Sequence, residues 1–234
     1  MRRVLLVLAC CACTRAMVKK EVVDVDRGGV SPPAPAREQV GDDDVPPLEG
    51  IEAVLAAARA HLGKTTVRVA GRSFRYDCSG FVRGMFWAAG IDLMSEGGEP
   101  DDNGVRIVFR YVERHGQNHF HTIPRKGDLV YFDNTWDKNG NGILDDPLTH
   151  VGIVEEVRAD GTIQIIHRAK HGIVREPMNL RRPHEAKDGD GRDINAQLRP
   201  KGRRDPPATP RLMSELFAGF GTVRKDEKAP SNTQ

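Results

Sequence analysis

Cys78 stands in the stretch Y-D-C-S-G-F-V, residues 76–82, and is the only cysteine after residue 13. Apolar residues then recur at three-to-four spacing up to Gly90, so we expect Cys78 at the start of a buried helix. Unpaired backbone N–H groups and the positive end of the helix dipole favour a thiolate there. Cys78 is therefore a candidate nucleophile, and its own backbone N–H is a natural oxyanion donor. A buried structural cysteine is the alternative.

Two of the eight histidines are candidates for serving the thiol. Only His150 and His167 sit at the edges of predicted strands, and neighbouring antiparallel strands bring such residues side by side. His150 would take the Cys78 proton to form a thiolate and imidazolium pair, and His167 would orient the imidazole. Attack of the sulfur on an amide would give a thioester, which water then releases. Two structural histidines are the alternative.

The secondary-structure elements that must position these residues are predicted as helices in the first part of the domain and strands in the second. Apolar residues recur at helical spacing, each time before a glycine, in residues 51–62, 81–89 and 105–112. Short apolar runs predict strands at residues 129–132, 151–154, 163–167 and 172–174. This order predicts an α+β domain, with N-terminal helices packed on an antiparallel sheet of about five to six strands.

Residues 137–146, D-K-N-G-N-G-I-L-D-D, lead directly to His150 and alternate oxygen-bearing side chains as a calcium loop does. The candidate calcium ligands are Asp137, Asn139, Asn141, Ile143, Asp145 and Asp146. The twelfth position of the loop is Leu148 instead of glutamate, so we expect Asp146 to replace the missing ligand. A polar turn that needs no ion is the alternative.

The two ends of the chain differ in composition from its middle. Residues 1–13 combine two arginines, a short apolar run and small residues before cysteine, which predicts an export signal. Val7 to Cys10 resembles a lipobox, so Cys10 is the candidate for lipidation and Cys13 the alternative; a plain signal peptide or a buried strand is also open. Residues 14–48 predict a disordered tether, 49–180 the folded domain, and 181–234 a C-terminal extension that docks in part.

Four blocks of sequence resemble, in this order, the NlpC family of papain-like cysteine peptidases, which are bacterial cell-wall hydrolases. The blocks are D-C-S-G-F-V at 77–82, K-G-D-L-V-Y-F at 126–132, H-V-G-I-V at 150–154 and I-I-H at 165–167. The resemblance implies a papain-like fold, with Cys78 as the nucleophile, His150 as the base and His167 as the orienting residue. It implies no cofactor for catalysis, so calcium would be structural only.

The resemblance also suggests residues that contact substrate. It implies that Asp77 and Ser79 hold the free amine of a stem peptide, and Asp77 is equally well placed to cap the Cys78 helix. Tyr76 is a candidate for the same end of the cleft. Arg168 stands where the family usually has a small residue, and its charge would suit a substrate carboxylate; a side chain that only points to solvent is the alternative. The segment before the cysteine, T-T-V-R-V-A-G-R-S-F-R, also departs from the family pattern.

These observations predict an exported hydrolase of the bacterial envelope, lipid-anchored, facing the periplasm and monomeric. The family resemblance implies that its reaction is cleavage of the bond between γ-D-glutamate and diaminopimelate or lysine in peptidoglycan stem peptides. The 35 basic and 33 acidic residues give a net charge of +2, which argues against a nucleic-acid partner. The alternatives are an amidase or acyltransferase on another substrate, or a catalytically silent domain that binds peptidoglycan.

Overall fold

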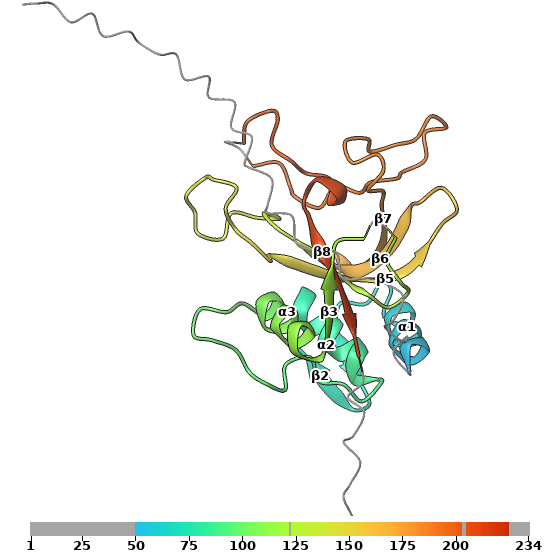
Figure 1. The fold of residues 1–234 in the computed structure, drawn as a ribbon, viewed down its shortest axis with the longest axis vertical. Helices are drawn as coiled ribbons and strands as arrows, with labels where there is room; N and C mark the ends of the chain where they lie inside the picture. Colours follow the sequence, from blue (N-terminus) through green and yellow to red (C-terminus); the bar gives the residue numbers. More distant parts are fainter. Residues whose placement is uncertain (1–49, 122, 203–204, 225–234) are drawn as a thin grey trace, which may run out of the picture. The chain divides into compact units, whose positions relative to one another are not determined.

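The computed structural model describes residues 50–121, 123–202 and 205–224 (Figure 1). The predicted export signal, the tether and the lipidation candidates Cys10 and Cys13 lie outside these residues. No helix in the described part is long and apolar enough to cross a membrane.

The described residues form three α-helices, one short 3-10 helix and eight strands. The helices are α1 (Ile51–Ala60), α2 (Cys78–Trp87), α3 (Gly104–His115) and the 3-10 helix η2 (Met213–Glu215). The strands are β1 (Val67–Val69), β2 (Arg72–Phe74), β3 (Gly116–His119), β4 (Leu129–Phe132), β5 (His150–Val157), β6 (Ile163–Ala169), β7 (Gly172–Met178) and β8 (Phe217–Val223).

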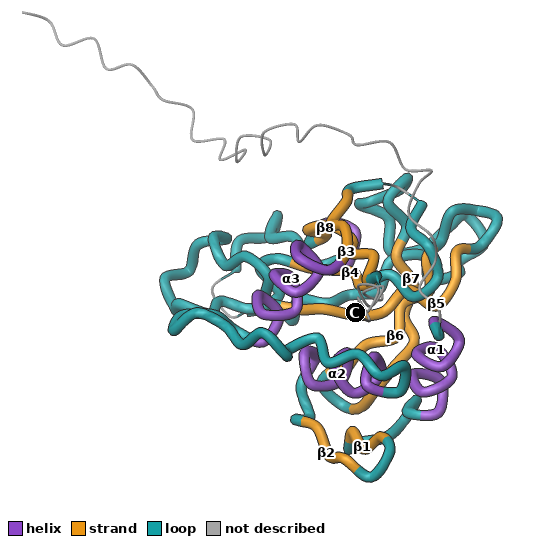
Figure 2. The backbone as a smooth tube through the Cα atoms, turned by 60° about the horizontal axis from the view of Figure 1, so that its bottom comes forward, coloured by secondary structure: helices purple, strands orange, loops and turns teal. Residues whose placement is uncertain are grey.

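The main sheet has six strands in the order β3-β8-β4-β5-β6-β7, and all its neighbours are antiparallel. The predicted α+β class and the antiparallel sheet of five to six strands are therefore confirmed. Strands β1 and β2 form a separate hairpin beside α2 (Figure 2). Gly84 of α2 permits this approach, because a Cβ there would lie 2.7 Å from a methyl group of Val67.

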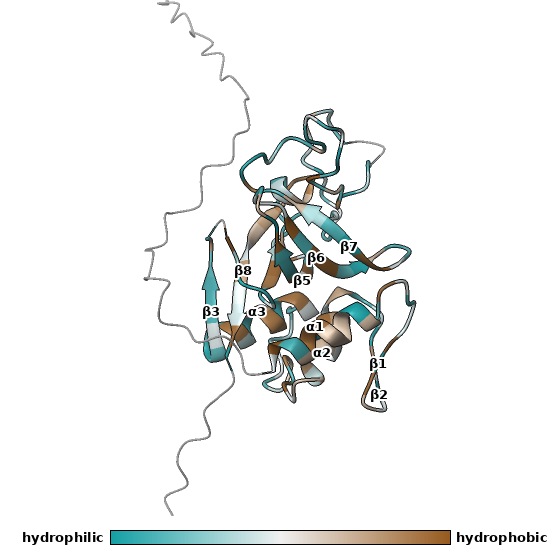
Figure 3. Ribbon diagram, turned by 90° about the vertical axis from the view of Figure 1, so that its right-hand side faces the viewer, coloured by the Kyte–Doolittle hydropathy of each residue, from teal (hydrophilic) through white to brown (hydrophobic). Residues whose placement is uncertain are grey.

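Both faces of the sheet are covered, which explains why its central strands are continuous apolar runs. In β4, Leu129 and Tyr131 pack into one core with the three helices, whereas Val130 and Phe132 pack into a second core. Residues from the chain after β7 complete this second core. Figure 3 shows the apolar segments of α2, β5 and β6 meeting between the layers.

The predicted domain boundary at residue 180 is wrong. Strand β8 lies inside the sheet between β3 and β4, so the folded domain continues to the end of the described residues. The stretch F-A-G-F-G-T-V hides this strand, because its glycines break the apolar run by which strands are identified. One of them is required: a Cβ on Gly221 would lie 2.6 Å from the Tyr131 hydroxyl.

Candidate active site

Cys78 is the first residue of α2, as the sequence predicts, and Asp77 is the N-cap of that helix. The Asp77 carboxylate accepts hydrogen bonds from the Gly80 backbone N–H (2.7 Å) and from the Ser79 hydroxyl (2.9 Å). Glycine is needed at position 80, since a Cβ there would lie 2.1 Å from the Arg75 carbonyl oxygen. The D-C-S-G motif therefore starts the helix: Asp77 caps it, Gly80 avoids a clash, and Cys78 becomes its first residue.

Two strands bring His150 and His167 together. His150 Nε2 lies 2.9 Å from His167 Nδ1, and His167 Nε2 lies 2.9 Å from a carboxylate oxygen of Glu176 on β7. Gly152 pairs directly with His167 in the sheet, and a Cβ on it would lie 3.1 Å from the His167 Cβ. The missing side chain leaves room for the imidazole to reach His150.

Glu176 is a functional candidate that the sequence argument missed. It is the third member of a chain of hydrogen bonds that begins at His150. Residue 174 pairs with His167, so Glu176, two residues along β7, lies on the same face of the sheet. The stretch G-I-V-R-E-P-M at residues 172–178 has no alternation that would assign Glu176 to a face, and the strand register is not visible in one sequence.

The Cys78 thiol lies against the backbone of Val151, the residue next to His150. A backbone hydrogen bond from Val151 is among the contacts that act on the thiol. No hydrogen bond joins the sulfur to either histidine among the described residues. Catalytic hydrogen bonds are often long in ligand-free enzymes and tighten when substrate binds.

The protonation state differs from the thiolate that the helix start predicts. Burial, followed by the charge of Asp77, raises the Cys78 pKa to about 11, although backbone hydrogen bonds from Val151, Ser79 and Cys78 itself oppose the shift. Burial, followed by the charges of His167 and Arg168, holds the His150 pKa well below its usual range. The resting site therefore combines a neutral thiol with a neutral imidazole, because desolvation outweighs the helix dipole.

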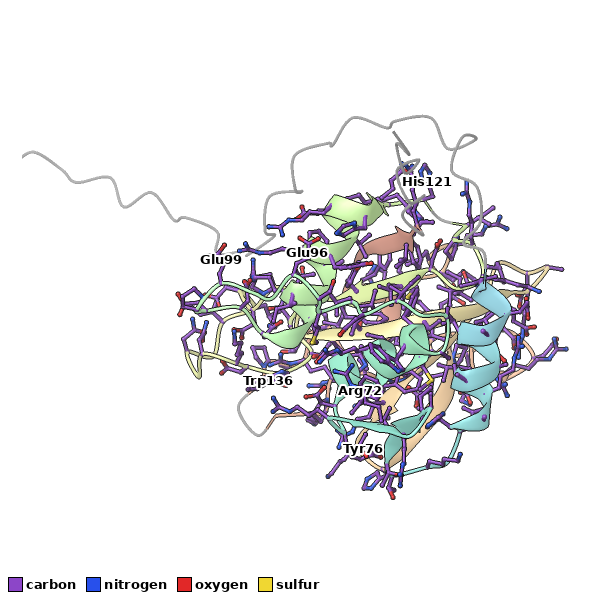
Figure 4. All side chains as sticks on the ribbon, turned by 90° about the horizontal axis from the view of Figure 1, so that it is seen from below. Arg72, Tyr76, Glu96, Glu99, His121 and Trp136 are labelled. Atoms are coloured by element: carbon purple, nitrogen blue, oxygen red, sulfur yellow. The ribbon has the colours of Figure 1, made fainter. Side chains whose placement is uncertain are left out.

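A cleft of about 600 Å³ opens on one side of Cys78. Its walls come from the β1–β2 hairpin, the start of α2, the start of α3 and the segment between β4 and β5. Arg72 and Trp136 are two wall residues from different elements (Figure 4). The cleft is large enough for a peptide segment and combines charged groups with an exposed indole.

The proposed substrate contacts fall around the same cysteine. Asp77 caps α2, as one of its two readings required, and its second oxygen lies 2.7 Å from the Arg75 guanidinium. Ser79 is buried and donates to Asp77. The Arg168 guanidinium stacks 4.6 Å from the centre of the Tyr76 ring. The binding roles of these four residues remain predictions.

The predicted calcium loop folds around Asp145. The side-chain amides of Asn139 and Asn141 donate to its two carboxylate oxygens, at 2.8 and 2.9 Å. Asp137 accepts from the backbone N–H groups of Gly140 and Gly142. Ile143 is exposed, and its backbone carbonyl would be the seventh-position ligand.

Asp146, the candidate replacement for the missing twelfth ligand, is buried, and its carboxylate accepts from the Lys138 backbone N–H at 2.8 Å. Within the described ranges, no group of three or more His, Cys, Asp or Glu residues is arranged to hold a metal. Asparagine and backbone oxygens would have to supply the remaining ligands, so calcium stays a prediction.

Comparisons with known proteins agree with this geometry. Residues 69–169 match the family model of the CHAP domain, a range that includes Cys78, His150 and His167. A γ-D-glutamyl-L-lysine dipeptidyl-peptidase of Bacillus cereus is 22% identical over 139 residues, which cover 58% of this chain and 37% of that relative. The chain thus spans well under half the length of this relative.

A solved structure from Staphylococcus aureus is described as similar to a lipoprotein of the NLP/P60 family. Its sequence is 17% identical, its TM-score is 0.42, and the match covers 80% of this chain and 46% of that chain. In the present structure, a helix that begins with cysteine packs on an antiparallel sheet that carries the paired histidines. The family match and the curated relative fit what the four sequence blocks indicate: this chain resembles the NlpC-type, papain-like cysteine peptidases.

Proposed function

We propose that this protein is a cysteine peptidase or amidase that hydrolyses an amide bond in the stem peptides of peptidoglycan. The observation that carries the proposal is the hydrogen-bonded chain from His150 through His167 to Glu176, which begins one residue before Val151, whose backbone contacts the Cys78 thiol. The CHAP match and the activity in the relative's name support the same chemistry.

The neutral pair defines how the reaction starts. His150 accepts the thiol proton on Nδ1 while the Cys78 sulfur attacks the amide carbonyl carbon, and the backbone N–H of Cys78 stabilises the oxyanion. The imidazolium is stabilised through His167, whose other nitrogen contacts the Glu176 carboxylate. His150 then gives the proton to the leaving nitrogen, the C–N bond breaks, and a thioester remains. Water, deprotonated by His150, hydrolyses the thioester and restores the thiol.

The substrate bond is the finer part of the proposal. The resemblance favours the bond between γ-D-glutamate and diaminopimelate or lysine, and the relative is named for γ-D-glutamyl-L-lysine. Asp77 would meet an ammonium group of the stem peptide, in competition with Arg75 at 2.7 Å. Arg168 would meet a carboxylate, since its Nε is buried and has no acceptor among the described residues.

Export and lipid anchoring at Cys10, with Cys13 as the alternative, place the enzyme in the periplasm beside this substrate. Mass spectrometry of the mature N-terminus tests the anchor directly. A diacylglyceryl mass on Cys10 supports it, and an N-terminus that begins elsewhere without lipid overturns it.

Digestion of purified muropeptides with the wild-type protein and with Cys78→Ala tests the activity. We expect new peptides ending in γ-D-glutamate with the wild type and none with the variant, whose melting temperature should match the wild type. Products cut at another amide would identify a different peptidase or amidase, and enlarged products would identify acyl transfer. Binding to peptidoglycan without turnover would establish the silent domain instead.

A further inference from the structure

The segment between β4 and β5, residues 133–149, forms one wall of the cleft at Cys78. Trp136, Lys138 and Thr149 of this segment line the cleft together with Cys78. Trp136 is 53% exposed. Residue 149 directly precedes His150, but β5 is paired with β4 and β6, so the sheet positions the base and the segment positions the cleft wall.

The two ends of the segment, which we call its root, are joined to each other by hydrogen bonds. Asn134 has a positive φ of 55°, donates its backbone N–H to the Asp146 carbonyl, and accepts the Asp146 N–H on its side chain, both at 2.8 Å. Thr135 donates its backbone N–H to the Thr149 hydroxyl oxygen at 2.9 Å. The backbone N–H and the side-chain oxygen of Asn134 thus form hydrogen bonds within the segment, whereas its carbonyl oxygen accepts a hydrogen bond from outside the segment.

That carbonyl is held by Arg199, which is 65 residues away in the chain after β7. Arg199 Nη1 donates to the Asn134 carbonyl oxygen at 2.5 Å, and the arginine is 8% exposed. Its backbone N–H is fixed to the Arg211 carbonyl at 3.1 Å, and Asp205 lies 3.6 Å from its Nη2. Contacts with residues 205 and 211 therefore hold Arg199 in place, and its side chain bonds the root of the cleft wall at Asn134.

Burying the Arg199 guanidinium at this position is energetically unfavourable. A buried guanidinium loses its hydration, and Arg199 Nε has no acceptor among the described residues. An apolar side chain of similar length would pack without this cost but would leave the Asn134 carbonyl unbonded. The contribution of the guanidinium is therefore the hydrogen bond that positions Asn134, and not packing.

We propose that Arg199 is a positioning residue for the proposed reaction: it fixes the cleft wall that carries Trp136 and Lys138, and so sets the affinity for substrate. The inference rests on the proposed peptidase activity. It also gives the chain after β7 a specific role at the site, beyond covering the sheet.

The test uses Arg199→Met, which removes the charge and keeps the length, and Arg199→Lys, which restores a donor. With muropeptide substrate, we expect Arg199→Met to raise KM about tenfold, the loss of one charged hydrogen bond, with kcat changed less than about twofold. Arg199→Lys should recover most of this loss. The control is Arg192→Met, an exposed arginine whose side chain is 73% accessible, which should change neither value.

A second measurement does not depend on activity. The chain has two tryptophans, so in a Trp87→Phe background the fluorescence reports Trp136 alone. Acrylamide quenching should increase in Arg199→Met and return toward the parent value in Arg199→Lys. Unchanged quenching and KM overturn the inference. Equal loss in both variants, or a lower kcat at constant KM, also overturns it. If the wild type cleaves no muropeptide, the proposed function fails while the quenching result still decides the role of Arg199.

Discussion

At the scale of single residues, burial controls the chemistry of Cys78. The helix start and three backbone hydrogen bonds favour the thiolate, yet desolvation and the neighbouring Asp77 raise the thiol pKa to about 11. His150 is driven in the opposite direction, toward the neutral imidazole. With the thiol pKa above the imidazole pKa, proton transfer must accompany attack on the substrate, and a pre-formed ion pair is disfavoured.

The alkylation rate of Cys78 tests this order of pKa values. Only the thiolate reacts, so the iodoacetamide rate should rise about tenfold per pH unit from pH 6 toward pH 11. The measurement is mass spectrometry of the Cys78 peptide, which separates it from the N-terminal cysteines. A rate plateau between pH 5 and 8 would reveal an ion pair and refute the neutral resting state.

Glu176 is expected to act on catalysis through His167. Glu176→Ala removes the acceptor at 2.9 Å and frees the His167 ring to reorient, so kcat should fall by at least about tenfold with KM little changed. Glu176→Gln keeps an oxygen acceptor and should retain more activity than Glu176→Ala. Steady-state kinetics check this, and equal activity in all three proteins would remove Glu176 from the mechanism.

At the scale of elements, the strand pair β5–β6 depends on a glycine. A Cβ on Gly152 would lie 2.7 Å from an Ile165 methyl group and 3.1 Å from the His167 Cβ. Gly152→Ala should therefore shift β6 and the imidazole, lowering kcat by at least about tenfold and stability by about 1–3 kcal/mol. Gly189→Ala is the matched control, since no atom lies within 4 Å of its Cβ position. Kinetics and thermal melts that do not distinguish the two variants would contradict this account.

The loop at residues 137–146 gives a second prediction at this scale. If Asp137, Asn139, Asn141 and Asp145 hold calcium, adding calcium should raise the melting temperature and EGTA should reverse the gain. Magnesium should do less, because it demands a tighter octahedral shell. Asp145→Asn should abolish the response, since it removes the charge at the centre of the loop. Identical melting curves with calcium and with EGTA would leave the loop as a polar turn.

Sequence reasoning was most reliable for elements with a clear apolar pattern. The three α-helices were predicted because their apolar residues repeat at helical spacing, and strands β4 to β7 because each contains a short apolar run. The hairpin β1–β2 was missed, because each strand has three residues and an exposed middle position. Glu176 and Arg199 were missed because their roles depend on strand register and on a contact across 65 residues.

At the scale of the whole molecule, the chain after β7 closes the structure around the site. Strand β8 pairs with β4, and β4 pairs with β5, the strand that begins with His150. Arg199 holds the root of the cleft wall, and η2 contributes Met213 to the second core. A cleft built near the start of the domain therefore depends on its last strand.

A chain that ends at residue 180 should fail to fold for the same reason. It lacks β8, so the backbone groups of β4 lose their ladder partners, and the second core loses Phe220, which is fully buried. Losing one such phenylalanine costs about 3–5 kcal/mol, a large part of the roughly 5–15 kcal/mol that stabilises a domain. Thermal unfolding of residues 45–180 and 45–224, followed by circular dichroism, should show a cooperative transition only for the longer chain. Phe220→Ala in the longer chain should lower its stability by about 3–5 kcal/mol. A cooperative transition in the shorter chain would mean that β4 to β7 and the helices form an independent unit, with β8 an addition to it.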